Sequence, residues 1–148
     1  MKKLTTIFAA SILLISANAF TPPPDSVSNE IKTAFEKIFS SAFDVSWKKV
    51  NDYYLATFQF DEHEATAAYN KDGQLISASR MLTLSQLPLN ISLALQNQYP
   101  EYTFENLVSE IMKDGQNNYY IKGESEKKIV ILKANGSGAL TVESKTKK

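Results

Sequence analysis

Two segments of the chain carry matching residues at a constant spacing of 65 positions, and this repeat limits the folds that the chain can adopt. The matches are a strand aromatic, a turn asparagine, a turn glycine and the first apolar residue after the turn. They are Tyr54, Asn70, Gly73 and Leu75, which recur as Tyr119, Asn135, Gly138 and Leu140. Repeated strand and turn residues predict a repeated supersecondary unit. The sequence therefore predicts two related α+β units.

The first copy predicts a four-stranded antiparallel meander with turns at Asn51-Asp52, Asp61-Glu62 and Asp72-Gly73. With two-residue turns, one face becomes mostly apolar and is expected to face a helix. This face collects Val45, Trp47, Tyr54, Ala56, Phe58, Ala65, Ala67, Tyr69, Ile76 and Ala78. The other face is mostly small and polar, as a solvated antiparallel face should be. It collects Ser46, Lys48, Tyr53, Leu55, Thr57, Gln59, Glu64, Thr66, Ala68, Ser77 and Ser79.

Each meander is preceded by a helix. In the first helix, apolar residues at helical spacing predict one buried stripe. Asp25, Ser26 or Ser28 can cap the N-terminus of this helix. The stripe consists of Ile31, Ala34, Phe35, Ile38 and Phe39. The second helix opens at Leu87-Pro88 and ends at Tyr99-Pro100. Its stripe consists of Ile91, Ala94, Leu95 and Gln98.

The second unit continues with strands at 102–112, 119–124, 128–134 and 139–143. The 65-residue offset assigns Tyr119, Ile121, Val130 and Leu132 to its core, and Tyr120, Lys122, Ile129 and Ile131 to its open face. Three large apolar side chains on a solvated face exceed ordinary scatter. The alternative is that the register slips at the 125–127 turn and the isoleucines belong to the core.

The first residues predict export. Lys2 and Lys3 precede an apolar run, and Ala17-Asn18-Ala19 matches a signal-peptidase site, which indicates cleavage after Ala19. The short n-region and simple cleavage site favour a bacterial periplasmic or secreted protein. The run is shorter than the roughly 20 residues of a membrane span, so no span is expected once the signal is removed.

Composition narrows the possible partners. The 16 Lys and Arg residues balance 16 Asp and Glu residues, so nothing favours nucleic acid as a partner. The absence of cysteine means that packing alone must hold the fold together. We expect a signal peptide at 1–19, a Pro-rich lead at 20–25, α+β units at 26–82 and 83–143 sharing one sheet, and a disordered Lys-rich tail at 144–148.

Several short motifs in this order resemble the PepSY-like family of small exported bacterial proteins. They are Ala34-Phe35, Val45-x-Trp47, Tyr54-x-Ala56-x-Phe58, Ala68-Tyr69-x-x-Asp72-Gly73, Leu87-Pro88 and Tyr99-Pro100. That family is similar in architecture to the β-lactamase inhibitor protein. The resemblance implies two tandem units, each a helix packed on a four-stranded antiparallel sheet, and an inhibitor or binding module. It implies no catalytic residues.

No motif predicts catalysis, a metal site or a cofactor. His63 is the only histidine and lies at a predicted turn, where a charged, solvated role is expected. Asn70-x-Asp72-Gly73 lacks the acidic positions of an EF-hand loop. The chain has no cysteine and no Gly-x-Ser-x-Gly motif. We therefore expect a protein that is not an enzyme.

The sequence favours a binding module that uses its open sheet face to bind an envelope protein or peptide. The expected partner-binding residues are Tyr53, Leu55, Thr57, Tyr120, Ile129 and Ile131. Self-association through the same residues is a further possibility. The alternative function is small-ligand binding or sensing, in a pocket between helix and sheet. Trp47 is expected beneath the first helix, and its alternative role is a binding aromatic on the open face.

Overall fold

One antiparallel sheet runs through the computed structural model, which describes residues 27–148. The strands are β1 (Phe43–Val50), β2 (Tyr53–Phe60), β3 (His63–Asn70), β4 (Leu75–Thr83), β5 (Thr103–Phe104), β6 (Leu107–Lys113), β7 (Gln116–Glu124), β8 (Lys128–Asn135) and β9 (Leu140–Lys147). Their order is β1-β2-β3-β4-β6-β7-β8-β9, and β5 pairs with β7 off this path. The predicted α+β class and the shared sheet are confirmed. The signal peptide and Pro-rich lead lie outside the described residues.

Helix α1 (Asn29–Ile38) begins where Ser28 caps it, because the Ser28 Oγ atom accepts a hydrogen bond from the Ile31 backbone N–H at 3.4 Å. Ile31 and Phe35 are buried as predicted. Ile38 was predicted in the same stripe but is 49% exposed. The contact surface at this end of the helix is instead carried by Phe39, which packs on the core just past the last turn.

Helix α2 (Leu89–Gln98) follows a short 3-10 turn, η2 (Leu84–Gln86). It begins directly after Pro88, a residue that an N-terminus tolerates because it has no N–H to donate. Ile91 and Leu95 are buried, as their spacing predicts. Gln98, the last member of the predicted stripe, is exposed instead.

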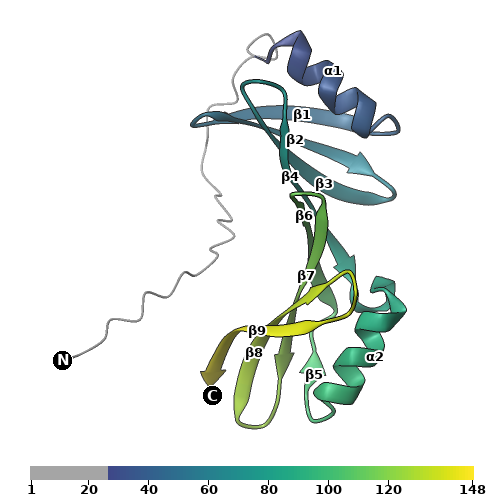
Figure 1. Ribbon diagram of the computed structural model, residues 1–148, viewed down its shortest axis with the longest axis vertical. Coiled ribbons are helices and arrows are strands. Elements are labelled where there is room, and N and C mark those ends of the chain that lie inside the picture. Colours follow the sequence, from purple (N-terminus) through teal and green to yellow (C-terminus); the bar gives the residue numbers. More distant parts are fainter. Residues whose placement is uncertain (1–26) are drawn as a thin grey trace, which may run out of the picture.

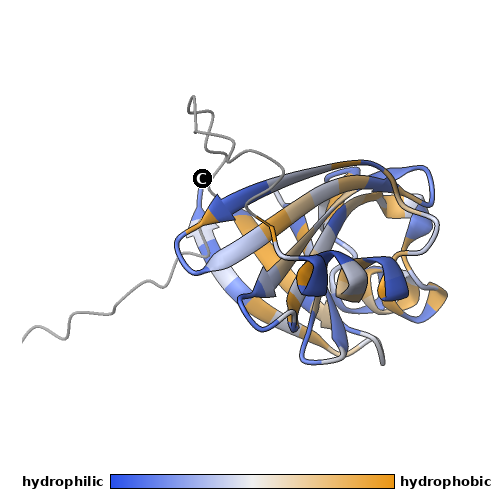
Figure 2. Ribbon diagram, turned by 90° about the horizontal axis from the view of Figure 1, so that it is seen from above, coloured by the Kyte–Doolittle hydropathy of each residue, from blue (hydrophilic) through white to orange (hydrophobic). Residues whose placement is uncertain are grey.

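The two helices cover the same face of the sheet but different parts of it. Ala78 packs against the cluster under α1, and Leu82 belongs to the cluster under α2. Side chains an even number of positions apart on one strand share a face, so both helices lie on one side of β4. Figure 1 shows α1 and α2 near opposite ends of the molecule, with β4 and β6 between them. Hydrophobic residues are interspersed with hydrophilic ones along the strands (Figure 2), which fits a sheet covered on one face.

The register of the first three strands matches the prediction. Trp47 pairs with Ala56, which pairs in turn with Ala67, and Tyr54 pairs with Tyr69. Trp47 is half-buried and packs against the core under α1, so its predicted side of the sheet is confirmed. The predicted pairing of Val45 with Phe58 is interrupted, because the register shifts next to Asp44, whose φ is 53°.

The third turn differs from the prediction, and the error places Ile76 on the wrong face. The Asn70 Oδ1 atom accepts hydrogen bonds from the backbone N–H groups of Asp72 and Gln74, which closes a loop of four residues rather than two. A bulge follows, so Tyr69 pairs with Leu75 instead of Ile76. Leu75 packs on the core, and Ile76 lies with Tyr53, Leu55 and Ala68 on the uncovered face.

The repeat is present at the level of individual hydrogen bonds. The Asn135 Oδ1 atom accepts from the backbone N–H groups of Ser137 and Ala139, as Asn70 does in the first unit. Gly73 and Gly138 both have positive φ, at 73° and 87°, where side chains are strained. Both units therefore use the same asparagine–glycine loop to join their last two strands.

The second unit departs from the first in its opening strand. A single strand was predicted over 102–112, but the structure has two separate strands, β5 and β6. β5 pairs with the last two residues of β7, Gly123 and Glu124. The β6–β7 hairpin is also longer, since its pairs Met112–Asn117 and Lys113–Gln116 have no counterpart in the first unit. This extension runs along β4 into the first unit.

The predicted disordered tail is wrong. Ser144, Lys145, Thr146 and Lys147 pair with Ile131, Val130, Ile129 and Lys128 as the second half of β9. The hydrogen-bonded backbone holds these residues in place, although their side chains remain exposed.

Replacing Gly123 with Ala should destabilise the fold by about 1–3 kcal/mol, the usual cost of overpacking. A Cβ atom at Gly123 would lie 2.8 Å from the ring of Phe104, which packs over this glycine. Gly136→Ala is the matched control, because nothing lies within 4 Å of its added Cβ atom. Urea unfolding of both variants measures the difference, and an equal loss in both would contradict the contact.

Replacing Tyr69 with Phe should raise the free energy of unfolding by about 1 kcal/mol, because an unpaired buried hydroxyl carries a desolvation cost. Tyr69 is fully buried, and its hydroxyl has no hydrogen-bond partner within residues 27–148.

Burial raises the pKa of Tyr69 from 10.0 to about 12. The unfolded chain releases this proton first, so wild-type stability should fall as the pH rises from 10 to 12. In the variant this fall should be smaller, and denaturant midpoints across that range test both expectations.

Candidate functional site

The six predicted partner-binding residues all lie on the face that the helices leave uncovered. Tyr53, Leu55 and Thr57 alternate along β2 with the core residues Ala56 and Phe58. Tyr120 lies on β7 between two buried residues, and Ile129 and Ile131 flank buried Val130 on β8. The alternative of core isoleucines therefore does not hold.

Two of the three predicted residues on β2, Tyr53 and Leu55, line a shallow apolar depression of about 250 Å³, whereas Thr57 lies outside it. Tyr53 and Leu55 line it together with Ala68 of β3 and Ile76 of the bulge in β4. Tyr53 is 46% exposed, so part of the wall of the depression is open to a partner. Sequence reasoning missed Ile76 because it assumed a two-residue turn.

The second group forms a more dispersed surface. Ile131 is 38% exposed and pairs across strands with Lys122, while Tyr120 pairs with Lys133. The Lys122 ammonium is hydrogen-bonded to the Glu105 carboxylate, and this contact raises the pKa of Lys122. The apolar side chains therefore alternate with charged ones on this part of the face.

The structure does not bring the two groups into contact. Three strands, β3, β4 and β6, separate β2 from β7, which corresponds to about 19 Å at the usual strand spacing. Met81 and Ile111 lie on the intervening strands and the same face, and Met81 is 46% exposed. Neither residue was predicted from the sequence, although the alternation along β4 and β6 could have identified both.

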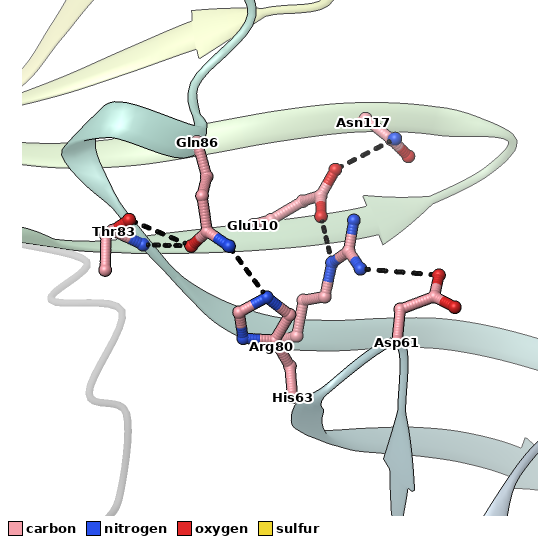
Figure 3. Close-up of polar contacts among 7 residues, drawn as sticks. All are labelled: Asp61, His63, Arg80, Thr83, Gln86, Glu110 and Asn117. Atoms are coloured by element: carbon pink, nitrogen blue, oxygen red, sulfur yellow. Dashed lines mark hydrogen bonds and ion pairs between the residues drawn. The ribbon is translucent and has the colours of Figure 1, made fainter.

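A polar cluster joins the two units on the opposite face (Figure 3). The Arg80 Nε atom donates a hydrogen bond to Glu110 at 2.6 Å across the β4–β6 pair. The second Glu110 oxygen accepts from the Asn117 side-chain amide at 3.2 Å, and Asp61 lies 3.9 Å from the Arg80 guanidinium. The Glu110 side chain is only 10% exposed. Its charge is therefore held by specific partners rather than by water.

Tyr119 belongs to the same environment. Burial raises the pKa of Tyr119, and interaction with Glu110 raises it further. The cluster lines a groove of about 170 Å³ together with the apolar side chains of Phe39, Phe60 and Met112. This volume is below the roughly 300–1,000 Å³ of small-molecule sites. The cluster is best explained as a connection between the units.

His63 is hydrogen-bonded rather than simply solvated. The Gln86 Oε1 atom accepts from the backbone N–H and the hydroxyl of Thr83, so its amide nitrogen faces His63 and donates to the ring Nε2 at 3.0 Å (Figure 3). This contact ties the start of β3 to η2. In the part of the chain from 27 to 148, no three His, Asp or Glu side chains are placed to hold a metal ion, and no helix could span a bilayer.

Comparisons with solved structures show the fold. A BLIP-like protein from Bacteroides fragilis is 20% identical, with a TM-score of 0.69 over 87% of this chain and 89% of that one. A DUF2874 family protein from Bacteroides ovatus is also 20% identical, with a TM-score of 0.65 over 87% and 89%. A protein from Bacteroides eggerthii, provisionally described as periplasmic, is 14% identical, with a TM-score of 0.61 over 87% and 90%. No family model matches the sequence, and a search of curated proteins finds no match.

These likenesses support the β-lactamase-inhibitor-like architecture that the sequence resemblance implied. At such low identity they show the fold alone, and the PepSY-like resemblance stays an expectation from the sequence. The neighbours are a BLIP-like protein, a DUF2874 family protein and a periplasmic candidate, and none is described as an enzyme.

Replacing Glu110 with Gln should destabilise the fold by about 1–3 kcal/mol, because Arg80 then loses its charged partner in a largely buried contact. Glu105→Gln is the control, since its ion pair with Lys122 is exposed and should contribute little to stability. Chemical denaturation compares the two. The connecting role of Arg80 and Glu110 would be contradicted if both variants lost the same stability.

Proposed function

We propose that this protein is a non-enzymatic binding module that holds a protein or peptide of the cell envelope on its uncovered sheet face. The observation that carries the proposal is the apolar depression beside Tyr53 and Leu55, on a face that neither helix covers. Depressions of this kind accept a protruding apolar side chain, and such anchors dominate the energy of many interfaces.

Apolar side chains continue across the face beyond the depression. Met81 on β4 of the first unit is 46% exposed and Ile131 on β8 of the second unit is 38% exposed, and Tyr120 on β7 lies between them in strand order. Exposed apolar surface that is spread over several strands and edged by polar groups is typical of protein interaction sites. The proposed partner therefore contacts both units at once.

The charges on this face favour an acidic partner. Lys48 and Lys113 lie at the two ends of one cross-strand row whose middle is Leu55, Ala68 and Ser77. No ion pair within residues 27–148 involves either lysine. An apolar depression between two lysines suits an apolar side chain flanked by carboxylates.

The proposed location is the periplasm or the cell exterior. The signal peptide expected at residues 1–19 supports it, as does the provisional description of the neighbour from Bacteroides eggerthii. Cleavage after Ala19 can be checked by N-terminal sequencing of the exported protein.

The test compares partner capture by the wild-type protein with capture by variants on each group of residues. Tyr53→Asp places a charge beside the depression, and Tyr120→Asp with Ile131→Asp places two on the second unit. Both should reduce capture from an envelope extract by at least about tenfold, because each buries a carboxylate against the partner. Leu89→Asp is the control, since Leu89 is 74% exposed on α2, on the other face.

The captured partner should then bind in purified form, more weakly as salt rises, because the proposal includes the lysines. Undiminished binding by both open-face variants would refute the site. Light scattering of the protein alone measures whether it forms a dimer. If the wild-type protein is a dimer and both variants are monomers, the occupant of the face is a second copy of the chain.

A further inference from the structure

A cleft lies between α1 and the edge strand β1, away from the open face. Its volume is about 440 Å³, within the roughly 300–1,000 Å³ of ligand sites. The aromatic wall consists of Phe35, Phe39 and Trp47, and Ala42 and Val45 complete the apolar part. Lys32, Glu36 and Ser40 supply polar groups from the helix and its end.

The second unit shows why the first one has this cleft. The strand that corresponds to β1 is β6, which is paired on its outer side with β4. Leu82, Leu84 and Leu87 of β4 and the following turn pack onto the second core. The outer side of β1 has no neighbouring strand among the described residues, so the space beside α1 stays open.

The residues that follow the two helices also differ, and the smaller residue is in the first unit. Phe39 and Tyr99 are equivalent, since each donates its N–H to the carbonyl four residues earlier at the end of its helix. Three residues later the first unit has Ala42 and the second has Tyr102. The Tyr102 ring packs on Tyr99 with 5.5 Å between centroids. A small residue thus lines the cleft where the other unit has an aromatic ring.

A polar atom without a partner lies behind the aromatic wall. The Tyr69 ring is 6.1 Å from Trp47 and 6.4 Å from Phe35, centroid to centroid. Its hydroxyl is buried and has no hydrogen-bond partner within residues 27–148. The position equivalent to Tyr69 in the second unit is Ala134, which has no such group. The open cleft and the unpaired hydroxyl thus occur in the same unit.

We propose that this cleft is a binding site for a planar aromatic molecule that carries one carboxylate. Aromatic rings pack edge-to-face against one another, as Phe35 and Trp47 already do at 5.5 Å. Lys32 is half-buried at the rim and provides an ammonium group for the carboxylate. Glu36, also at the rim, disfavours a second negative charge on the ligand.

The experiment uses 2-naphthoate as the probe and its neutral amide as the comparator. Trp47 is the only tryptophan, so its indole N–H gives one separate signal in a proton–nitrogen correlation spectrum. The expected result is a saturable shift of that signal with 2-naphthoate. Lys32→Gln should weaken naphthoate binding about two- to fivefold, the range for a partly exposed ion pair, and leave binding of the amide unchanged.

Ala42→Tyr tests the position of the site by introducing the residue that the second unit has there. The naphthoate-dependent shift of the Trp47 signal should disappear, while the backbone signals remain those of a folded protein. Val45→Phe fills the cleft from the strand side, and serves if the first variant disturbs the fold. The absence of a saturable shift in the wild-type protein would overturn the proposal, as would undiminished binding by a folded, filled variant.

The open-face variants separate this site from the proposed function. Tyr120→Asp with Ile131→Asp should leave naphthoate binding unchanged, because these residues lie on the other face and in the other unit. Loss of naphthoate binding in that double variant would place the probe on the sheet face. It would likewise overturn the proposal that the cleft is the binding site.

Discussion

The backbone ladder between β4 and β6 is the interaction on which the rest of the structure depends. It pairs Ser77–Thr83 with Leu107–Lys113 and is the join in the sheet between the two units. The two hydrophobic clusters have no buried residue in common. Arg80 and Glu110 bridge the same pair of strands, and both are satisfied only when that pairing is in register. The ladder therefore fixes how one half of the open face continues into the other.

Much of this arrangement could be predicted because it depends on local patterns. Alternation along β2 and β3 gave the correct faces, and Asn70 and Asn135 marked a turn that both units use. The errors arose where a side chain or a distant strand decides the backbone. The Asn70 side chain lengthens its loop and so moves Ile76 to the open face. The polar tail resembles a disordered segment, and only its pairing with β8 makes it a strand.

The site predictions were likewise correct where they depend on local alternation and incomplete where they depend on the topology of the sheet. Strand parity correctly placed Tyr53, Leu55, Thr57, Tyr120, Ile129 and Ile131 on one face. Parity contains no information on how far apart two strands of a sheet lie, so the separation of the two groups was not foreseen. The cleft beside α1 depends on which strand lies at the sheet edge, and that is a property of the topology.

The two units share a fold, but their positions in the sheet differ. Equivalent helix residues such as Phe35 and Leu95 are 60 positions apart, whereas Asn70 and Asn135 are 65 apart. The additional residues lie mainly in the longer β6–β7 hairpin, which carries Asn117 to Glu110. The second unit thus contributes the longer hairpin at the join, and the edge strand of the first unit, β1, is the one that lies beside a cleft.

An open sheet with two edges carries the hazard of head-to-tail polymerisation, since β1 of one molecule could pair with β9 of the next and so on without closure. Both edge strands are rich in lysine: Lys48 and Lys49 lie on β1, and Lys145 and Lys147 lie on β9. Stacking molecules edge to edge would bring these like charges together, and the kink at Asp44 would break the ladder. The lysines of the two edge strands therefore disfavour fibre growth by edge-to-edge pairing.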